Sequence, residues 1–136
     1  MKTLLSLFAI LAFYYCDINA QKLVNISNKK ANEIISIMHE QEKNWNKMDF
    51  KGFMQGYWKS DSLQFIGQSG ITYGWQKTLD NYKKHYPDKA SAGILNFTIL
   101  YIEGLSSSSA YVIGKWHLIR EKGNIEGYYT HIMEKK

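Results

Sequence analysis

The sequence predicts an α+β protein in which helices cover one face of a curved antiparallel sheet. Apolar residues recur at helical spacing through much of residues 28–86, whereas three long segments after residue 93 have the composition and turn boundaries of strands. The chain has 136 residues, of which 45% are hydrophobic and 15% are aromatic, with one Pro and one Cys. These values fit one compact domain and exclude disorder, a collagen and a disulfide scaffold.

The first predicted helix covers residues 28–48, with Ser27 or Asn28 as its cap. Its apolar positions are spaced three, four and seven residues apart, which indicates one buried face. They are Ala31, Ile34, Ile35, Met38 and Trp45. Asp49 can cap a second, short helix over residues 50–58, which carries a heavy apolar stripe that includes Phe53 and Tyr57.

Residues 62–67 alternate and predict a short strand, with a turn at 68–70. Helical spacing returns at Trp75, and Pro87 ends this third helix. The three remaining segments, 94–103, 110–121 and 125–134, predict an antiparallel meander.

The last two strands allow a prediction about faces. A two-residue loop at 122–123 or 123–124 would pair the two strands so that two sets of side chains lie on the same face of the sheet. A three-residue loop would break this pairing. The two sets are Gly114, Trp116 and Leu118, and Tyr129, His131 and Met133.

Residues 1–20 have the layout of a secretory signal peptide: Lys2, an apolar run from Leu4 to Tyr15, and Ala20 at the cleavage point. The run is shorter than the roughly 20 residues that span a bilayer, so we expect export to the periplasm or beyond and no membrane span. Bulky residues precede Cys16, so we do not expect a lipoprotein. Cleavage near Ala20 would remove Cys16 and with it thiol and disulfide chemistry. Residues 21–136 would then form the single mature domain.

The net charge of +5 raises the question of an anionic partner, because several cationic side chains gather on and just after the third helix. They are Lys77, Lys83, Lys84, His85 and Lys89. A solvated helix face explains them, and export argues against nucleic acid, so we expect no nucleic-acid partner.

Metal and nucleotide sites are not expected either. The four histidines are far apart in the sequence and form no metal-binding pair, and no Gly-rich loop leads into a lysine-bearing helix. We therefore predict no metal and no cofactor.

The chain resembles the nuclear transport factor 2-like superfamily, also called SnoaL-like or ketosteroid isomerase-like. The resemblance covers about residues 30–133 and rests on Trp45-Asn46-x-x-Asp49, on the segment 53–63 (Phe-Met-Gln-Gly-Tyr-Trp-Lys-Ser-Asp-Ser-Leu), on 70–75 and on Gly114-Lys115-Trp116. Within this superfamily, the chain is similar to a small exported bacterial subgroup of unassigned function.

The resemblance implies a cone in which a strongly bent antiparallel sheet wraps around a long helix, with an apolar pocket at the wide end and often a dimer formed through the sheet. The superfamily includes isomerases, dehydratases, cyclases, ligand-binding proteins and transport adaptors, so it implies the fold more firmly than an activity. Members of the subgroup usually continue into a further strand, so we expect the domain to be short at its C-terminus.

Asp61 is the first candidate catalytic residue, because an acid near this junction shuttles a proton in the isomerase branch. Such a base must be desolvated, and Tyr57, Trp58 and Phe65 could provide apolar surroundings. An oxyanion would need a donor, for which the phenols Tyr57, Tyr73, Tyr82 and Tyr129 are available. The alternative is that Asp61 caps the turn before the strand.

His131 is the second candidate catalytic residue. If its face of the sheet is concave, Trp116 and His131 line the pocket together, and His131 becomes a proton carrier near neutral pH. The resemblance gives no catalytic role to this position, and a partly exposed histidine on an edge strand is the alternative.

Three functional hypotheses follow. In the leading one, the domain binds a small apolar molecule in an aromatic pocket. The lining residues would be Tyr57, Trp58, Phe65, Tyr73, Trp75 and Trp116. The second is a cofactor-free isomerase, dehydratase or cyclase with Asp61 as general base. The third is a protein-interaction module that forms a homodimer through its sheet.

Overall fold

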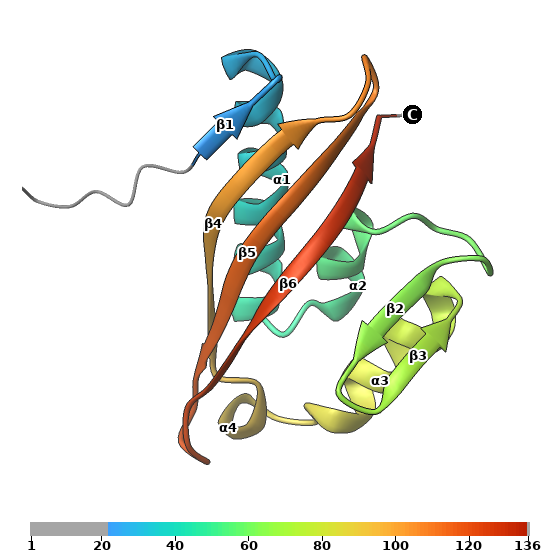
Figure 1. Cartoon of the computed structure of the whole chain (residues 1–136). Helices are drawn as coiled ribbons and strands as arrows, with labels where there is room; N and C mark the ends of the chain where they lie inside the picture. The colour runs from blue at the N-terminus through green and yellow to red at the C-terminus, as the bar shows by residue number, and fades with distance from the viewer. Residues whose placement is uncertain (1–21, 136) are drawn as a thin grey trace, which may run out of the picture.

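The computed structural model describes residues 22–135, so the expected signal peptide and Cys16 lie outside the described residues. The predicted fold class is confirmed: helices near the N-terminus pack on a curved antiparallel sheet (Figure 1). Between residues 22 and 135, no helix combines the length and hydropathy that crossing a bilayer requires.

Helix α1 (Asn28–Asn46) begins at Ser27, whose hydroxyl accepts a hydrogen bond from the Lys30 N–H at 3.4 Å. Its buried face repeats at helical spacing, as predicted. The buried residues are Ala31, Ile34, Met38, Gln41 and Trp45. The second predicted helix is shorter than expected, because it consists of α2 (Phe50–Phe53) and the 3₁₀ helix η1 (Met54–Gly56), after which the backbone is extended.

Two further helices and a hairpin lie beside this core. Strands β2 (Gln64–Gly67) and β3 (Gly70–Tyr73) pair antiparallel, and α3 (Trp75–His85) and α4 (Lys89–Ala92) follow. Strand β3 and helix α4 are not predicted from the sequence, because each is only four residues long and too short to show a period.

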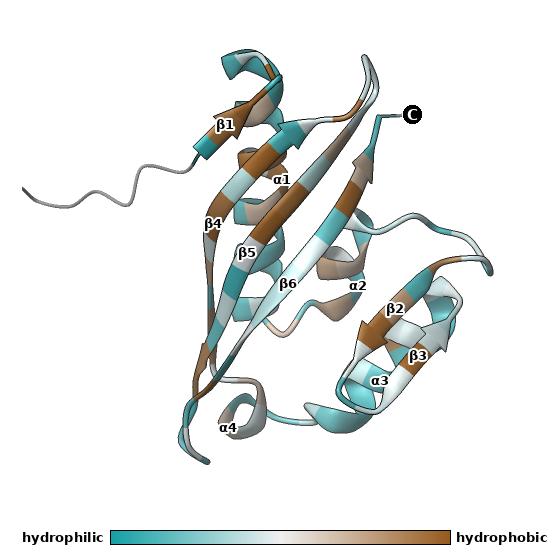
Figure 2. Ribbon diagram, viewed as in Figure 1, coloured by the Kyte–Doolittle hydropathy of each residue, from teal (hydrophilic) through white to brown (hydrophobic). Residues whose placement is uncertain are grey.

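The main sheet has the strand order β1-β4-β5-β6. Strand β1 (Lys22–Val24) is parallel to β4 (Ile94–Gly104), and β4, β5 (Ser109–Ile119) and β6 (Ile125–Glu134) form the predicted meander. Hydrophobic and hydrophilic residues alternate along its strands (Figure 2), which gives the sheet one face toward the helices.

The predicted sharing of faces by β5 and β6 is confirmed, since Gly114 lies opposite Tyr129 and Leu118 opposite Ile125. The turn itself is displaced from the predicted position: the Gly123 N–H donates to the Arg120 carbonyl, so the turn residues are 121–122. The faces are unchanged, because any two-residue turn in this loop pairs an even-numbered residue with an odd-numbered one.

A register shift in β4 between Ile99 and Tyr101 bends the sheet. The extra residue allows both Ile99 and Ile102 to contact the core, and such a bulge increases local twist and curvature. The helices α1 and α2 lie on the concave side that results (Figure 1).

The outer edge of β4 is closed by α1 where β1 does not cover it. The Asn46 side chain accepts from the Leu95 N–H at 2.8 Å and donates to the Leu95 carbonyl at 3.2 Å. One turn earlier, the Glu42 carboxylate accepts a hydrogen bond from the Phe97 N–H. These side chains satisfy backbone groups that an edge strand would otherwise leave to solvent.

Candidate functional site

Five aromatic side chains gather between the helices, the β2–β3 hairpin and the concave face of the sheet. We call this group the aromatic site; it consists of Tyr57, Phe65, Tyr82, Tyr129 and His131. All five are partly buried, and they come from four different parts of the fold. The site therefore exists only in the folded chain.

Tyr57 is at the centre of the aromatic site. It follows η1, where the extended backbone directs the chain away from the helix. Its ring centroid lies 6.3 Å from that of Phe65 and 5.8 Å from that of His131. Phe65 in turn lies 5.7 Å from Tyr82 in an edge-to-face arrangement, a geometry that aromatic rings favour.

The hydroxyl groups of Tyr57 and Tyr82 share a hydrogen bond. Burial raises the pKa of Tyr57 to about 12, an effect that the hydrogen bond from Tyr82 partly offsets. Burial likewise raises the pKa of Tyr82 well above its usual value, and the nearby Tyr57 adds to this. Both phenols therefore stay protonated at neutral pH and act as neutral hydrogen-bonding groups.

Tyr129 lies flat over β5 because position 114 carries no side chain. A Cβ at Gly114 would lie 2.2 Å from both Cζ and the hydroxyl oxygen of Tyr129. This hydroxyl is buried and has no hydrogen-bond partner among the described residues. Burial raises the pKa of Tyr129, and the charge of Glu42 raises it further, so the group is a protonated donor without an acceptor.

His131 lies beside Tyr129 on the concave face, with ring centroids 4.7 Å apart. Burial lowers the pKa of His131 to about 4, because the imidazolium form loses hydration. The imidazole is therefore neutral at pH 7, with one nitrogen able to accept a hydrogen bond and the other able to donate one. It is not poised to exchange protons near neutral pH, the role proposed for it in the sequence analysis.

The site as a whole is aromatic, and its phenol and imidazole groups are uncharged at neutral pH. It offers ring faces and edges for apolar contacts, together with the free hydroxyl of Tyr129 and the neutral imidazole of His131. Such surroundings favour an apolar molecule with a hydrogen-bonding atom over an ion, which would lose its hydration without gaining a counter-charge.

The six residues predicted to line a pocket do not lie together. The structure brings Tyr57 and Phe65 into one cluster and adds His131. Tyr73 is 60% exposed, because it pairs with Gln64 and so lies on the opposite face of the hairpin from Phe65. Because the sequence did not predict β3, it could not show that Tyr73 and Phe65 lie on opposite faces of the hairpin.

The tryptophans have separate positions. Trp75 is 5% exposed in the core and donates from Nε1 to the Met54 carbonyl at 2.8 Å, whereas Trp58 is 50% exposed. Trp116 faces the concave side, but its ring covers Gly127, and it packs on the core around Trp45. In the pairing of β5 with β6, Trp116 lies opposite Gly127, which is four residues along β6 from His131.

Asp61 lies in the turn between η1 and β2, and its side chain is exposed. A general base of the predicted kind needs desolvation, which this position does not provide. No group of three or more His, Cys, Asp or Glu side chains suited to a metal ion is found within residues 22–135.

Comparison with solved structures agrees with the observed α+β architecture. A domain of unknown function with a cystatin-like fold from Nostoc punctiforme PCC 73102 is 13% identical, with a TM-score of 0.67 over 82% of this chain and 71% of that one. A ketosteroid isomerase-like protein from Erwinia carotovora is 12% identical, with a TM-score of 0.54 over 78% of this chain and 81% of that one. At these identities, the likeness shows the fold alone.

A third structure establishes the family. An NTF-2 like protein of unknown function from Shewanella oneidensis MR-1 is 41% identical, with a TM-score of 0.75, and the match covers 79% of this chain and 88% of that one. The chain therefore belongs to the nuclear transport factor 2-like family, as the resemblance implied. No family model matches the chain, and no curated protein matches it.

Proposed function

We propose that the aromatic site binds a small, uncharged, mostly apolar molecule that carries one hydrogen-bond-accepting oxygen. The family fold and the aromatic cluster are compatible with a small-molecule binding domain. The oxygen would accept from the Tyr129 hydroxyl, and the apolar part would pack on the rings of Tyr57 and Phe65.

The observation that carries this proposal is the unpartnered hydroxyl of Tyr129. A buried donor without an acceptor costs about 1–3 kcal/mol, and a phenylalanine at this position would avoid that cost. A ligand oxygen within hydrogen-bond distance would accept from this hydroxyl and so remove the cost. The neutral His131 next to the same ring adds a second group that can contact such a ligand without charge.

A matched pair of probes tests the proposal: 2-acetylnaphthalene, which has a carbonyl oxygen, and 2-ethylnaphthalene, which has none. Binding to the full chain and to Tyr129→Phe is measured by titration calorimetry. We expect Tyr129→Phe to weaken the ketone about tenfold, which corresponds to about 1.4 kcal/mol, and to leave the hydrocarbon unchanged. Tyr128→Phe is the control, because Tyr128 is 73% exposed on the other face of β6. Equal affinity of the two probes for the unmodified chain would contradict the proposal.

We favour binding over turnover as the function of this site. The enzyme hypothesis requires Asp61 as a general base, and its carboxylate is exposed. Asp61→Asn should therefore leave the affinity for 2-acetylnaphthalene unchanged. If the chain isomerises, dehydrates or cyclises a substrate, loss of that turnover in Asp61→Asn with intact binding would establish the enzyme hypothesis instead.

A homodimer through the convex face of the sheet is the second candidate function. This face exposes several large hydrophobic side chains, which monomeric proteins usually avoid grouping. They include Leu100 at 37%, Ile119 at 48%, Tyr128 at 73% and Ile132 at 69% exposure. Sedimentation of the full chain at micromolar concentration tests it: we expect a dimer, and Ile132→Lys should shift it to monomer. A monomer for the unmodified chain would rule out this interface.

We also propose that the protein acts after export, on the basis of the residue pattern in the first 20 positions. The mass of the protein recovered from the periplasm or medium of an expressing bacterium tests this. We expect the mass of a chain that starts at Gln21, whereas retention of the full-length chain inside the cell would contradict export.

A further inference from the structure

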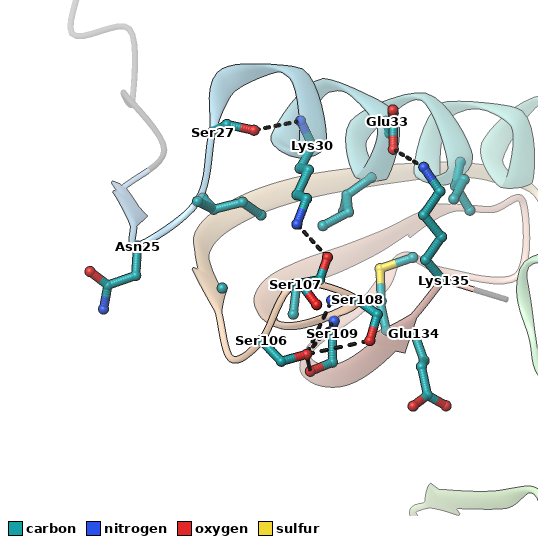
Figure 3. A pocket seen from close by; sticks show the side chains of 16 residues that line it. Asn25, Ser27, Lys30, Glu33, Ser106, Ser107, Ser108, Ser109, Glu134 and Lys135 are labelled. Atoms are coloured by element: carbon teal, nitrogen blue, oxygen red, sulfur yellow. Dashed lines mark hydrogen bonds and ion pairs between the residues drawn. The ribbon is translucent and has the colours of Figure 1, made fainter.

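A cavity lies at the end of the molecule where α1 begins, between that helix, the serine loop (residues 104–109) and the end of β6 (Figure 3). Its volume is about 330 Å³. This is near the lower limit of the roughly 300–1,000 Å³ that small-molecule sites occupy. None of the five residues of the aromatic site lines it.

The cavity has an apolar interior formed from two sides. Ile34 and Ile37 face it from α1, and Ala110 and Met133 face it from the sheet. Ile34 is 8% exposed and packs in the core, whereas Ile37 is 41% exposed, so part of the aliphatic lining is open to the solvent. An apolar chain placed between the helix and the sheet would cover it.

The two lysines at this cavity differ in how their charge is balanced. Lys135 forms an ion pair with Glu33, with Nζ and Oε2 3.4 Å apart. Lys30 instead donates to the Ser107 carbonyl, and no carboxylate within residues 22–135 forms an ion pair with it. Figure 3 shows Lys30 crossing from the helix to the serine loop, whereas Glu134 points away from both lysines. Lys30 therefore supplies one partly buried positive charge without a counter-charge.

The serine loop adds a second polar group beside this cation. The Ser106 hydroxyl accepts from the backbone N–H groups of Ser108 and Ser109 at 3.1 and 3.0 Å, which holds the loop in a turn. The hydroxyl of Ser107 makes no hydrogen bond with the described residues and lies on the residue that Lys30 contacts. A carboxylate at Lys30 could therefore also accept from Ser107.

We propose that this cavity binds a medium-chain monocarboxylate. Its carboxylate would pair with Lys30 and accept from Ser107, and its aliphatic chain would lie between Ile37 and Met133. A single negative charge fits, because one lysine is unbalanced and the other is already paired. An aliphatic tail fits because the apolar lining carries no aromatic ring and the volume is small.

The test uses octanoate and the full chain labelled with ¹³C at its methionine methyl groups. Met133 lines the cavity and reports on its occupancy, whereas Met38 and Met54 are fully buried in the core and are internal references. We expect octanoate to shift the Met133 signal saturably, with a Kd below about 1 mM, and 1-octanol to bind at least tenfold more weakly, because it lacks the charge.

Variants of the two lysines locate the carboxylate. Lys30→Met should weaken octanoate at least tenfold, Lys30→Arg should retain it within threefold, and Lys135→Met should change it less than threefold. Tyr129→Phe should have no effect, which separates this site from the aromatic site. Absence of a saturable Met133 shift, equal binding of octanol and octanoate, or the same Kd for Lys30→Met and Lys30→Arg would overturn the proposal.

Discussion

The two ends of α1 are packed in opposite ways. At its C-terminal end, Trp45 is 3% exposed and makes edge-to-face contacts with four rings at centroid distances of 5.0 to 5.5 Å. Its Nε1 also donates to the Ala92 carbonyl at 3.2 Å. At the N-terminal end, small and aliphatic residues such as Ala31, Ile34 and Ala110 form the contact with the sheet, and a cavity remains.

This difference indicates that the two ends of α1 have different roles. Large rings fill the space at the Trp45 end, and their indole and amide groups bond to the backbone, so that end stabilises the fold. The Ala31 end packs smaller side chains and adjoins the cavity. We infer that stability and binding can be changed separately by substitutions only four helical turns apart.

The largest expected effect is at the Trp45 end. Trp45→Ala should lower the free energy of unfolding by about 4 kcal/mol, because it removes a fully packed ring and leaves a large cavity. Ile34→Ala, at the other end, should cost only about 2 kcal/mol, since its site already adjoins open space. Urea unfolding followed by circular dichroism measures both. Equal losses of unfolding free energy in the two variants would contradict the inference that the two ends of α1 have different roles.

The second effect is a pH dependence that originates at His131. Its folded-state pKa of about 4 lies below the usual value of 6.5, so folding favours the neutral imidazole. The resulting stability is complete above about pH 6.5 and is lost as the pH falls toward 4. Between pH 7.5 and pH 5, the free energy of unfolding should fall by about 2 kcal/mol on this account.

Two variants isolate the contribution of His131. His131→Phe should remove most of the pH dependence in that window, because phenylalanine does not titrate. His85→Gln, at the exposed end of α3, should retain it. A His131→Phe chain whose stability falls with pH as steeply as that of the unmodified chain would contradict the assignment.

The smallest effects compare polar side chains at the two ends of α1. Asn46→Ala removes both hydrogen bonds to Leu95 and should cost about 1.5 kcal/mol. Ser27→Ala removes only the long 3.4 Å cap of Lys30 and should cost about 0.5 kcal/mol. Thermal melts of the two variants check this order. A larger loss for Ser27→Ala would show that the N-terminal end is the more tightly held one.

The long elements of the fold could be predicted from sequence because their periods are visible. The face assignment of β5 and β6 was also correct, since it depends only on alternation and on an even loop length. Strand β1 has three residues and pairs in parallel with a segment far along the chain, so nothing local could indicate it.

The site was harder to predict than the fold. Aromatic residues fill cores and line pockets alike, so the sequence could not separate the buried Trp75 from the clustered Tyr57. Tyr129 was placed on the face of Gly114 and named as an available phenol, but it was not chosen as a site residue, although a glycine in the middle of a strand was a signal that something large lies over it. The cavity beside the serine loop was missed, because a run of serines looks like an ordinary turn.

The side chains of Asn46 and Glu42 on the edge of β4 have a consequence for assembly. Together with β1, they occupy several of the backbone groups by which β4 could recruit another strand, so within residues 22–135 β6 is the long strand whose outer edge has no neighbouring strand. Strand exchange or fibril growth by the long strands would therefore proceed from one side of the molecule. Two copies could join β6 to β6, and such a pair would cover the open long edge of the sheet that residues 22–135 form.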